Sequence, residues 1–194
     1  MLLRIDGQEI AALPGQSLLD LVRQLGLDED KLSHRPLAAK IAGEVFTLNY
    51  IPVREKELSS DRPSMRRAME ASGGEVRLLR YADSAGRDAY KRTAQFIVFL
   101  AMRQLWPNAV TKMNCTIGRS VYMSASGAAD FDAERLKARV SELVAEDIAL
   151  LRRRVKLSDA VAYYSAQGQT DKARLLSWRS VDYFDEYVHG DFAD

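Results

Sequence analysis

The sequence predicts an α+β chain of two domains, and three observations lead to this expectation. Short apolar runs alternate with turn signals as far as Tyr81, with one short amphipathic segment among them. Small and polar residues then interrupt the pattern at 83–86. Beyond this break, apolar residues recur every three or four positions, which is the period of a helix. We therefore expect one domain over residues 1–83 and a second over residues 84–194.

A hairpin, a helix and further strands are expected in the first domain. Asp6 and Gly7 favour the positive φ angles of a tight turn between strands at 2–5 and 9–13. Ser17 can cap a short amphipathic helix that follows. The remaining expected elements are strands at 37–41, 45–48 and 76–81 and a short helix near 65–71. This order of elements is that of a β-grasp, the ubiquitin-like α+β fold.

A long helix is expected to open the second domain. Its apolar face runs from Tyr90 to Leu105, and Pro107 lies just beyond its end. A second long helix is expected after Asp130, with an apolar stripe that continues to Val155 and a basic run, Arg152 to Arg154, at its end. The other expected elements are strands at 110–113 and 120–124 and two helices capped by Ser158 and Thr170.

Composition argues against a membrane or metal protein. No apolar run approaches the ~18 residues of a membrane span, and the N-terminus lacks the apolar core of a signal peptide, so a cytoplasmic location is expected. The formal net charge is +1, without the basic excess typical of nucleic-acid binding. His189 and its acidic neighbours could bind a cation, but we expect a solvated acidic tail there. No metal site is predicted.

The motifs of two common enzyme classes are absent from the sequence. No Gly-x-x-x-x-Gly-Lys-Ser/Thr run exists that could cradle nucleotide phosphates, and Gly-x-Ser-x-Gly does not occur either. The chain is therefore expected to be inactive alone, with no catalytic residue and no cofactor of its own.

Several short motifs resemble those of a known family. They are Ala38 to Gly43, Leu105-Trp106-Pro107, Gly168 to Lys172 and Gly190 to Asp194. In order, the two halves resemble the TGS domain and the second additional domain at the N-terminus of threonyl-tRNA synthetases. The resemblance implies a β-grasp followed by an editing-domain-like α+β domain, cut short at its C-terminal end before a Cys-x-Gly-Pro-His motif.

The resemblance also implies that editing chemistry is missing. In that family the helix ending in Leu-Phe/Trp-Pro carries a His-x-x-x-His pair, and counting back from Pro107 puts Arg92 and Phe96 at these positions. Histidines at i and i+4 share a helix face and can bind a metal or position a water. A guanidinium and a phenyl ring can do neither.

A second resemblance suggests a different parent protein. The run from Ala85 to Arg92 resembles the Gly-x-x-x-Tyr-x-Arg entry of bacterial uridine kinase-like proteins, in which the same pair of domains precedes a P-loop kinase domain. The run from Ile117 to Tyr122 resembles their Ile/Leu-Gly-x-x-Tyr signature, with one extra residue. The leading hypothesis is a regulatory or ligand-sensing N-terminal region of such a nucleoside kinase, whose parent would phosphorylate uridine or cytidine with ATP and Mg²⁺.

These hypotheses imply different partners. A downstream kinase domain of the same polypeptide is the expected partner under the kinase hypothesis, with a nucleotide or phosphorylated metabolite as ligand. The alternative is a degenerate, threonyl-tRNA synthetase-like tRNA-binding module without editing activity, for which RNA is the partner.

One set of residues is expected to surround the former editing cleft. Its members are Arg87, Lys91, Arg92, Phe96, Asn114, Arg119 and Tyr122. Cations and an aromatic ring favour an anion or a nucleotide over a metal. A competing interpretation places Phe96 in the core and pairs Arg92 with a carboxylate.

Overall fold

The computed structural model describes residues 1–53, 63–118 and 120–193. The chain divides into two compact units, Met1–Ala94 and Gln95–Asp194. The boundary expected after residue 83 lies where helix α3 (Ser84–Leu105) begins, whereas the units divide within that helix. The expected domain ranges therefore stay a prediction. In the part of the chain that the structure describes, no helix is both long and apolar enough to cross a membrane.

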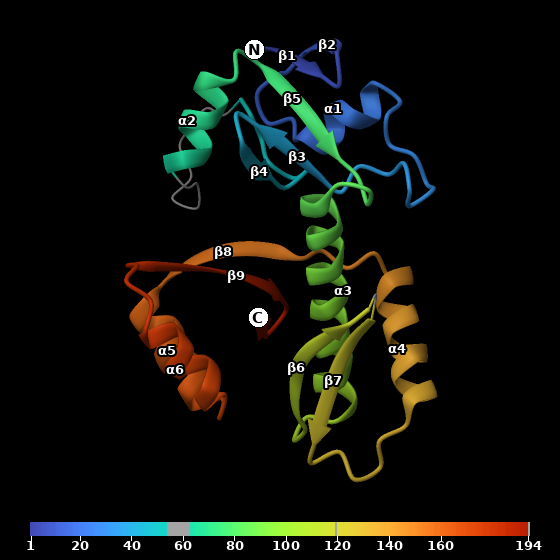
Figure 1. Cartoon of the computed structure of the whole chain (residues 1–194), viewed down its shortest axis with the longest axis vertical. Coiled ribbons are helices and arrows are strands. Elements are labelled where there is room, and N and C mark those ends of the chain that lie inside the picture. Colours follow the sequence, from blue (N-terminus) through green and yellow to red (C-terminus); the bar gives the residue numbers. More distant parts are fainter. Residues whose placement is uncertain (54–62, 119, 194) are drawn as a thin grey trace. The chain divides into compact units, whose positions relative to one another are not determined.

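The first unit has the β-grasp order of elements (Figure 1). The elements are β1 (Leu2–Ile5), β2 (Gln8–Ala11), α1 (Leu18–Gln24), β3 (Ala38–Ile41), β4 (Glu44–Phe46), α2 (Pro63–Ala71) and β5 (Glu75–Leu79). The strands are ordered β2-β1-β5-β3-β4, with β1 and β5 parallel and the other pairs antiparallel. The expected α+β fold class is confirmed.

Local sequence explains how this sheet begins. Asp6 and Gly7 have φ angles of 46° and 86°, which is the conformation of a tight hairpin turn between β1 and β2. Leu3 and Ile5 alternate with exposed neighbours on β1 and are fully buried. Ser17 caps α1 in a capping box with Asp20, and its hydrogen bonds lower the pKa of the Asp20 carboxyl.

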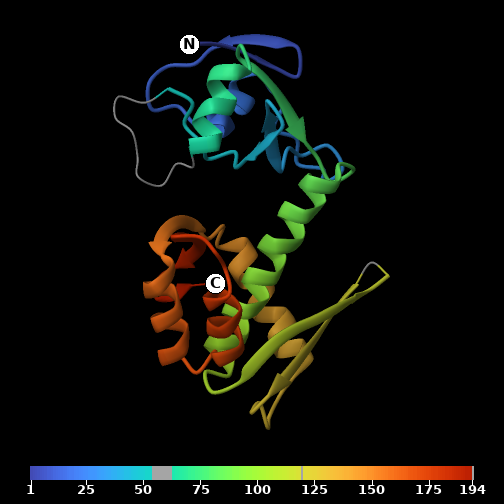
Figure 2. The same cartoon turned by 60° about the vertical axis from the view of Figure 1, so that its left-hand side comes forward.

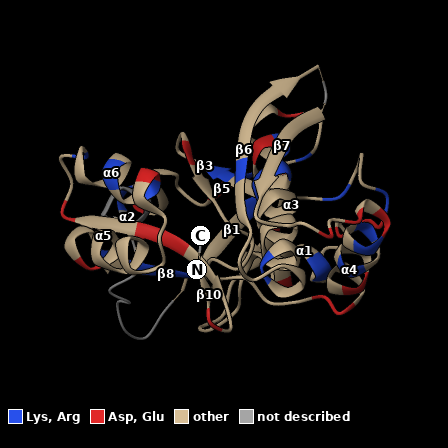
Figure 3. Ribbon diagram, turned by 90° about the horizontal axis from the view of Figure 1, so that it is seen from below, with Lys and Arg blue, Asp and Glu red and all other residues tan. Residues whose placement is uncertain are grey.

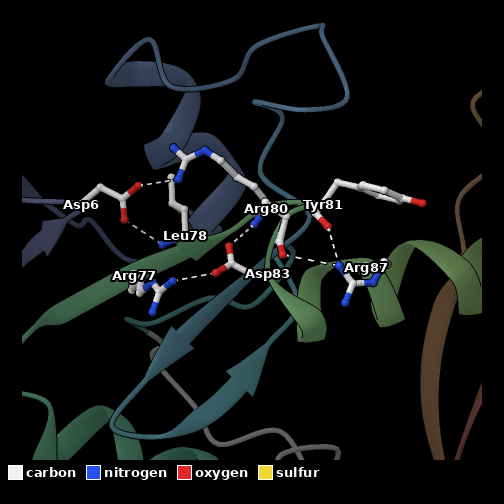
Figure 4. Close-up of polar contacts among 8 residues, drawn as sticks. Asp6, Arg77, Leu78, Arg80, Tyr81, Asp83 and Arg87 are labelled. Atoms are coloured by element: carbon white, nitrogen blue, oxygen red, sulfur yellow. Dashed lines mark hydrogen bonds and ion pairs between the residues drawn. The ribbon is translucent and has the colours of Figure 1, made fainter.

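A polar network ties the first hairpin to the end of β5 (Figure 4). The Asp6 carboxylate accepts hydrogen bonds from the Leu78 backbone N–H at 2.8 Å and from Arg80 Nη1 at 2.9 Å. Arg80 Nε donates to the His34 carbonyl at 3.0 Å, and the Asp83 carboxylate accepts from the Arg80 backbone N–H at 2.9 Å. Three segments distant in sequence therefore meet at one arginine.

The second unit contains helices and two separate antiparallel ribbons (Figures 1 and 2). Beyond the C-terminal half of α3 its elements are β6 (Val110–Ile117), β7 (Ser120–Ser126), α4 (Ala133–Ala145), β8 (Leu151–Lys156), α5 (Leu157–Ala166), α6 (Thr170–Ser177), β9 (Tyr183–His189) and β10 (Phe192–Ala193). Strands β10, β9 and β8 form one sheet, and β6 and β7 form a long hairpin. Figure 1 shows α5 and α6 on one side of the β8–β9 ribbon.

Two sequence predictions in this unit are wrong. The helix after Asp130 ends at Ala145, Asp147 takes a left-handed φ of 48°, and Arg152 to Arg154 lie on strand β8 instead of a helix end. The apolar stripe predicted a longer helix because its last residues belong to strand β8, which pairs with β9. This pairing joins residues distant in sequence, so the local pattern does not indicate it. Neither Ser158 nor Thr170 caps a helix. The N-cap residues of α5 and α6 are Lys156 and Gln169, and neither side chain makes a capping hydrogen bond.

Replacing Asp6 with Asn should destabilise the first unit by about 1–2 kcal/mol, because the charge-assisted bond to Arg80 is lost while Asn still tolerates the left-handed turn. The matched control is Glu9→Gln, which removes an exposed partner of Arg4 on the same hairpin and should cost less than about 0.5 kcal/mol. Urea unfolding followed by far-UV circular dichroism measures both. Equal costs for the two variants would contradict the role assigned to this network.

Candidate functional site

A groove of about 1260 Å³ lies within the second unit. Its walls are the C-terminal half of α3, the first half of β6, the turn between α5 and α6, and the turn between β9 and β10. Phe99, Tyr163 and Phe192 line it, together with amide side chains such as Asn108 and Asn114. Flat apolar surface beside hydrogen-bonding amides is suited to an aromatic heterocycle.

Three cations stand in the groove wall. Arg103 Nη2 donates to Gln167 Oε1 at 3.1 Å, so α3 is joined to the turn that follows α5. Lys112 Nζ lies 2.6 Å from Asp171 Oδ2, which joins β6 to α6. Lys172 is the third cation. The lining also contains the carboxylates of Asp171 and Asp191, which leaves a formal excess of one positive charge.

The ion pair between Lys112 and Asp171 depends on pH. The hydrogen bond from Lys112 lowers the pKa of the Asp171 carboxyl. Because the folded pKa lies below the unfolded value of about 3.9, the pair stabilises the fold above that pH. This contribution is lost as the pH falls through the folded pKa, so the pair is intact at neutral pH.

A network around the buried Glu186 carboxylate extends to Lys172 at the groove. The Arg153 guanidinium pairs with Glu186 at 2.5 Å, and Glu186 accepts a hydrogen bond from the Tyr164 hydroxyl at 3.0 Å. Lys172 Nζ lies 4.0 Å from the centre of the Tyr164 ring, a cation–π distance. Residues from β8, β9, α5 and α6 are thereby linked in one series of contacts.

This network corrects the expectation of a solvated acidic tail for Asp185 and Glu186, whereas Asp191 is exposed as expected. The acidic residues of β9, visible as a red segment in Figure 3, form part of a sheet, and Glu186 is only 2% exposed. The sequence could not reveal this, because the partner arginine lies 33 residues away in the chain. In the described residues, no cluster of three or more His, Cys, Asp and Glu side chains is arranged to hold a metal ion.

Phe96 lies in the core of the second unit. It is 5% exposed, and its ring meets that of Phe192 edge to face with 5.1 Å between the ring centres. Leu100, Ala101 and Leu143 belong to the same cluster. This packing agrees with the competing interpretation that places Phe96 in the core.

The other predicted ligand residues belong to both units. Arg87 Nη1 lies 3.4 Å from the carbonyl oxygens of Tyr81 and Ala82 in the first unit (Figure 4). In the same unit, Lys91 is half-buried and Arg92 is exposed on α3.

The second unit holds the remaining members of the predicted set. Asn114 lines the groove and donates to Ser124 Oγ at 2.9 Å. Tyr122 is 53% exposed on β7, and Arg119 lies outside the described residues. A ligand-binding role for the whole set stays a prediction.

Sequence reasoning missed the cations of the groove. Arg103 and Lys112 belong to no motif, and only the fold brings them together. Lys172 could have been found from the sequence, because it ends the run from Gly168 that resembles a synthetase turn.

The fold and the groove define an α+β chain of two units, the first of which is a β-grasp. Comparisons with known proteins show which enzymes this chain resembles. No protein-family model matches the chain. It is similar to threonine–tRNA ligases, the enzymes called threonyl-tRNA synthetases above: 25% identical to that of Pelobacter propionicus and 23% to that of Clostridium kluyveri, each over 97% of this chain. The ligase of Bacteroides fragilis is 26% identical over 84% of the chain. The chain spans only about a quarter of these relatives, 27%, 27% and 23% of their lengths.

These comparisons correct the leading hypothesis from the sequence. The similar proteins are threonine–tRNA ligases, and none points to a uridine kinase-like nucleoside kinase. A downstream kinase domain as partner is therefore also unsupported. The alternative, a synthetase-like module, is the better interpretation. The expectation that this chain has no cofactor of its own stays a prediction.

Truncating Phe96 to Ala should destabilise the second unit by about 3 kcal/mol or more, since a buried ring and its contact with Phe192 are removed. Tyr122→Ala, at a half-exposed ring from the same predicted set, should cost less than about 1 kcal/mol. Urea unfolding followed by tryptophan fluorescence reports on this unit, which contains both tryptophans. A small loss for Phe96→Ala would return this side chain to the list of ligand candidates.

Proposed function

We propose that this chain is a tRNA-binding module of the threonyl-tRNA synthetase type that does not carry the paired-histidine editing chemistry. The observation that carries the proposal is the similarity to threonine–tRNA ligases along 97% of the chain. A location in the cytoplasm, where tRNA is charged, is part of this proposal.

The groove supports the proposal through its chemistry. Arg103, Lys112 and Lys172 can neutralise phosphates, while Tyr163 and Phe99 offer flat surfaces to bases. Amide side chains such as Asn108 can donate to and accept from base edges. Binding of this kind involves few phosphates, which agrees with a formal net charge of only +1.

The residues in place of the two histidines support binding without hydrolysis. In the resemblance, Arg92 and Phe96 occupy these positions, and Phe96 is committed to the core by its contact with Phe192. A water molecule placed near this helix face would meet neither an imidazole base nor a metal there.

We expect the chain to bind tRNA with a binding constant K that falls as the salt concentration rises. The slope of log K against log salt should have a magnitude of about two to three, because about three cations face the groove. Fluorescence anisotropy with labelled tRNA measures this. The double variant Arg103→Gln with Lys172→Gln should weaken binding about tenfold and reduce the slope by about two.

The matched control is Lys137→Gln, which removes an exposed cation of α4 that does not line the groove. It should bind tRNA as the unaltered chain does. If all three proteins bind equally, the groove is not the tRNA site, and if none binds, the proposed function is wrong.

A further inference from the structure

The C-terminal end of α6 exposes a large aromatic side chain. Trp178, the C-cap residue of α6, is 82% exposed. The other tryptophan, Trp106, is 5% exposed and donates its indole N–H to Asp130 Oδ1 at 3.0 Å. An indole held almost wholly in water at the end of a packed helix contributes little to the core.

Two guanidinium groups accompany this indole. Arg174 precedes Trp178 by one helical turn and so lies on the same face of α6, and Arg179 follows it directly. Both arginines are exposed. In the described part of the chain neither guanidinium forms an ion pair, and Arg174 acts on the Asp171 carboxylate, one turn earlier on α6, only through its charge. The two guanidinium groups and the indole ring are therefore exposed together at the C-terminal end of α6.

This surface is continuous with the groove. Leu175 is 70% exposed, lies three residues before Trp178 on the helix, and also lines the groove. Lys172 lines the groove one turn further toward the start of α6. A strand that leaves the groove along α6 would therefore pass from Lys172 over Leu175 to Trp178.

We propose that the end of α6 is a stacking surface for single-stranded RNA, with an unpaired base on Trp178 and the adjoining phosphates beside Arg174 and Arg179. The inference rests on the proposed function, because it extends the RNA path beyond the groove. Single strands fit better than duplexes because their bases are free to stack on an aromatic face, whereas duplex bases are stacked on one another.

The test uses the intrinsic fluorescence of the full chain, titrated with a short oligoadenylate and, separately, with a blunt-ended RNA duplex. A base stacked on Trp178 should quench its emission, and the duplex should quench it far less. In Trp178→Phe, where buried Trp106 is the remaining tryptophan, the oligoadenylate should still bind by anisotropy but without quenching of the tryptophan emission.

Affinity variants give an independent readout. Trp178→Ala should weaken oligoadenylate binding about tenfold or more, the usual cost of losing one stacked base. Arg174→Gln with Arg179→Gln should reduce the salt slope by about one to two. Leu151→Ala, which truncates an exposed apolar side chain of β8, is the control and should change neither quantity.

The outcomes separate this inference from the proposed function. If the unaltered chain binds tRNA while Trp178→Ala binds oligoadenylate equally well, and no quenching occurs, the stacking surface is refuted and the tRNA-binding module stands. Equal quenching by duplex and single strand would also overturn the inference. If neither tRNA nor oligoadenylate binds, both proposals fall.

Discussion

The packing of Phe96 against Phe192 is the interaction on which the second unit depends. It joins α3 to the last strand, β10, and the same cluster continues through Leu100 and Ala101 to Leu143 of α4. Phe96 is only 5% exposed, so its ring is occupied by this core contact.

The groove is lined by residues further along the same helix. Its α3 wall begins at Phe99, one turn after Phe96, and includes Arg103, which reaches the turn after α5. On the opposite wall, the buried contacts of Glu186 with Arg153 and Tyr164 fix the ring over which Lys172 lies. A core contact and the ion pair of the buried Glu186 therefore help to position the cations of the groove.

Local signals in the sequence predicted most of the fold. The turn at Asp6 and Gly7, the cap at Ser17 and the alternating strands gave the β-grasp correctly, since each depends on neighbours in sequence. Strand β8 was missed because its pairing with β9 and the burial of Glu186 are tertiary effects that override helical periodicity. The site was predicted at Arg92 and Phe96 from a motif, but the groove cations are assembled only by folding.

The most direct test of the account follows a mischarged tRNA mixed with the chain, measuring binding by anisotropy and the lifetime of the aminoacyl ester in the same sample. The account predicts saturable binding with an ester lifetime equal to that of the free tRNA, because in the proposed correspondence with the synthetases Arg92 and Phe96 stand in place of the paired histidines. Absence of binding would contradict the RNA-binding function. If the chain accelerates the loss of the ester, and replacing a groove residue such as Lys172 abolishes this acceleration, the chain has editing chemistry and the account is wrong.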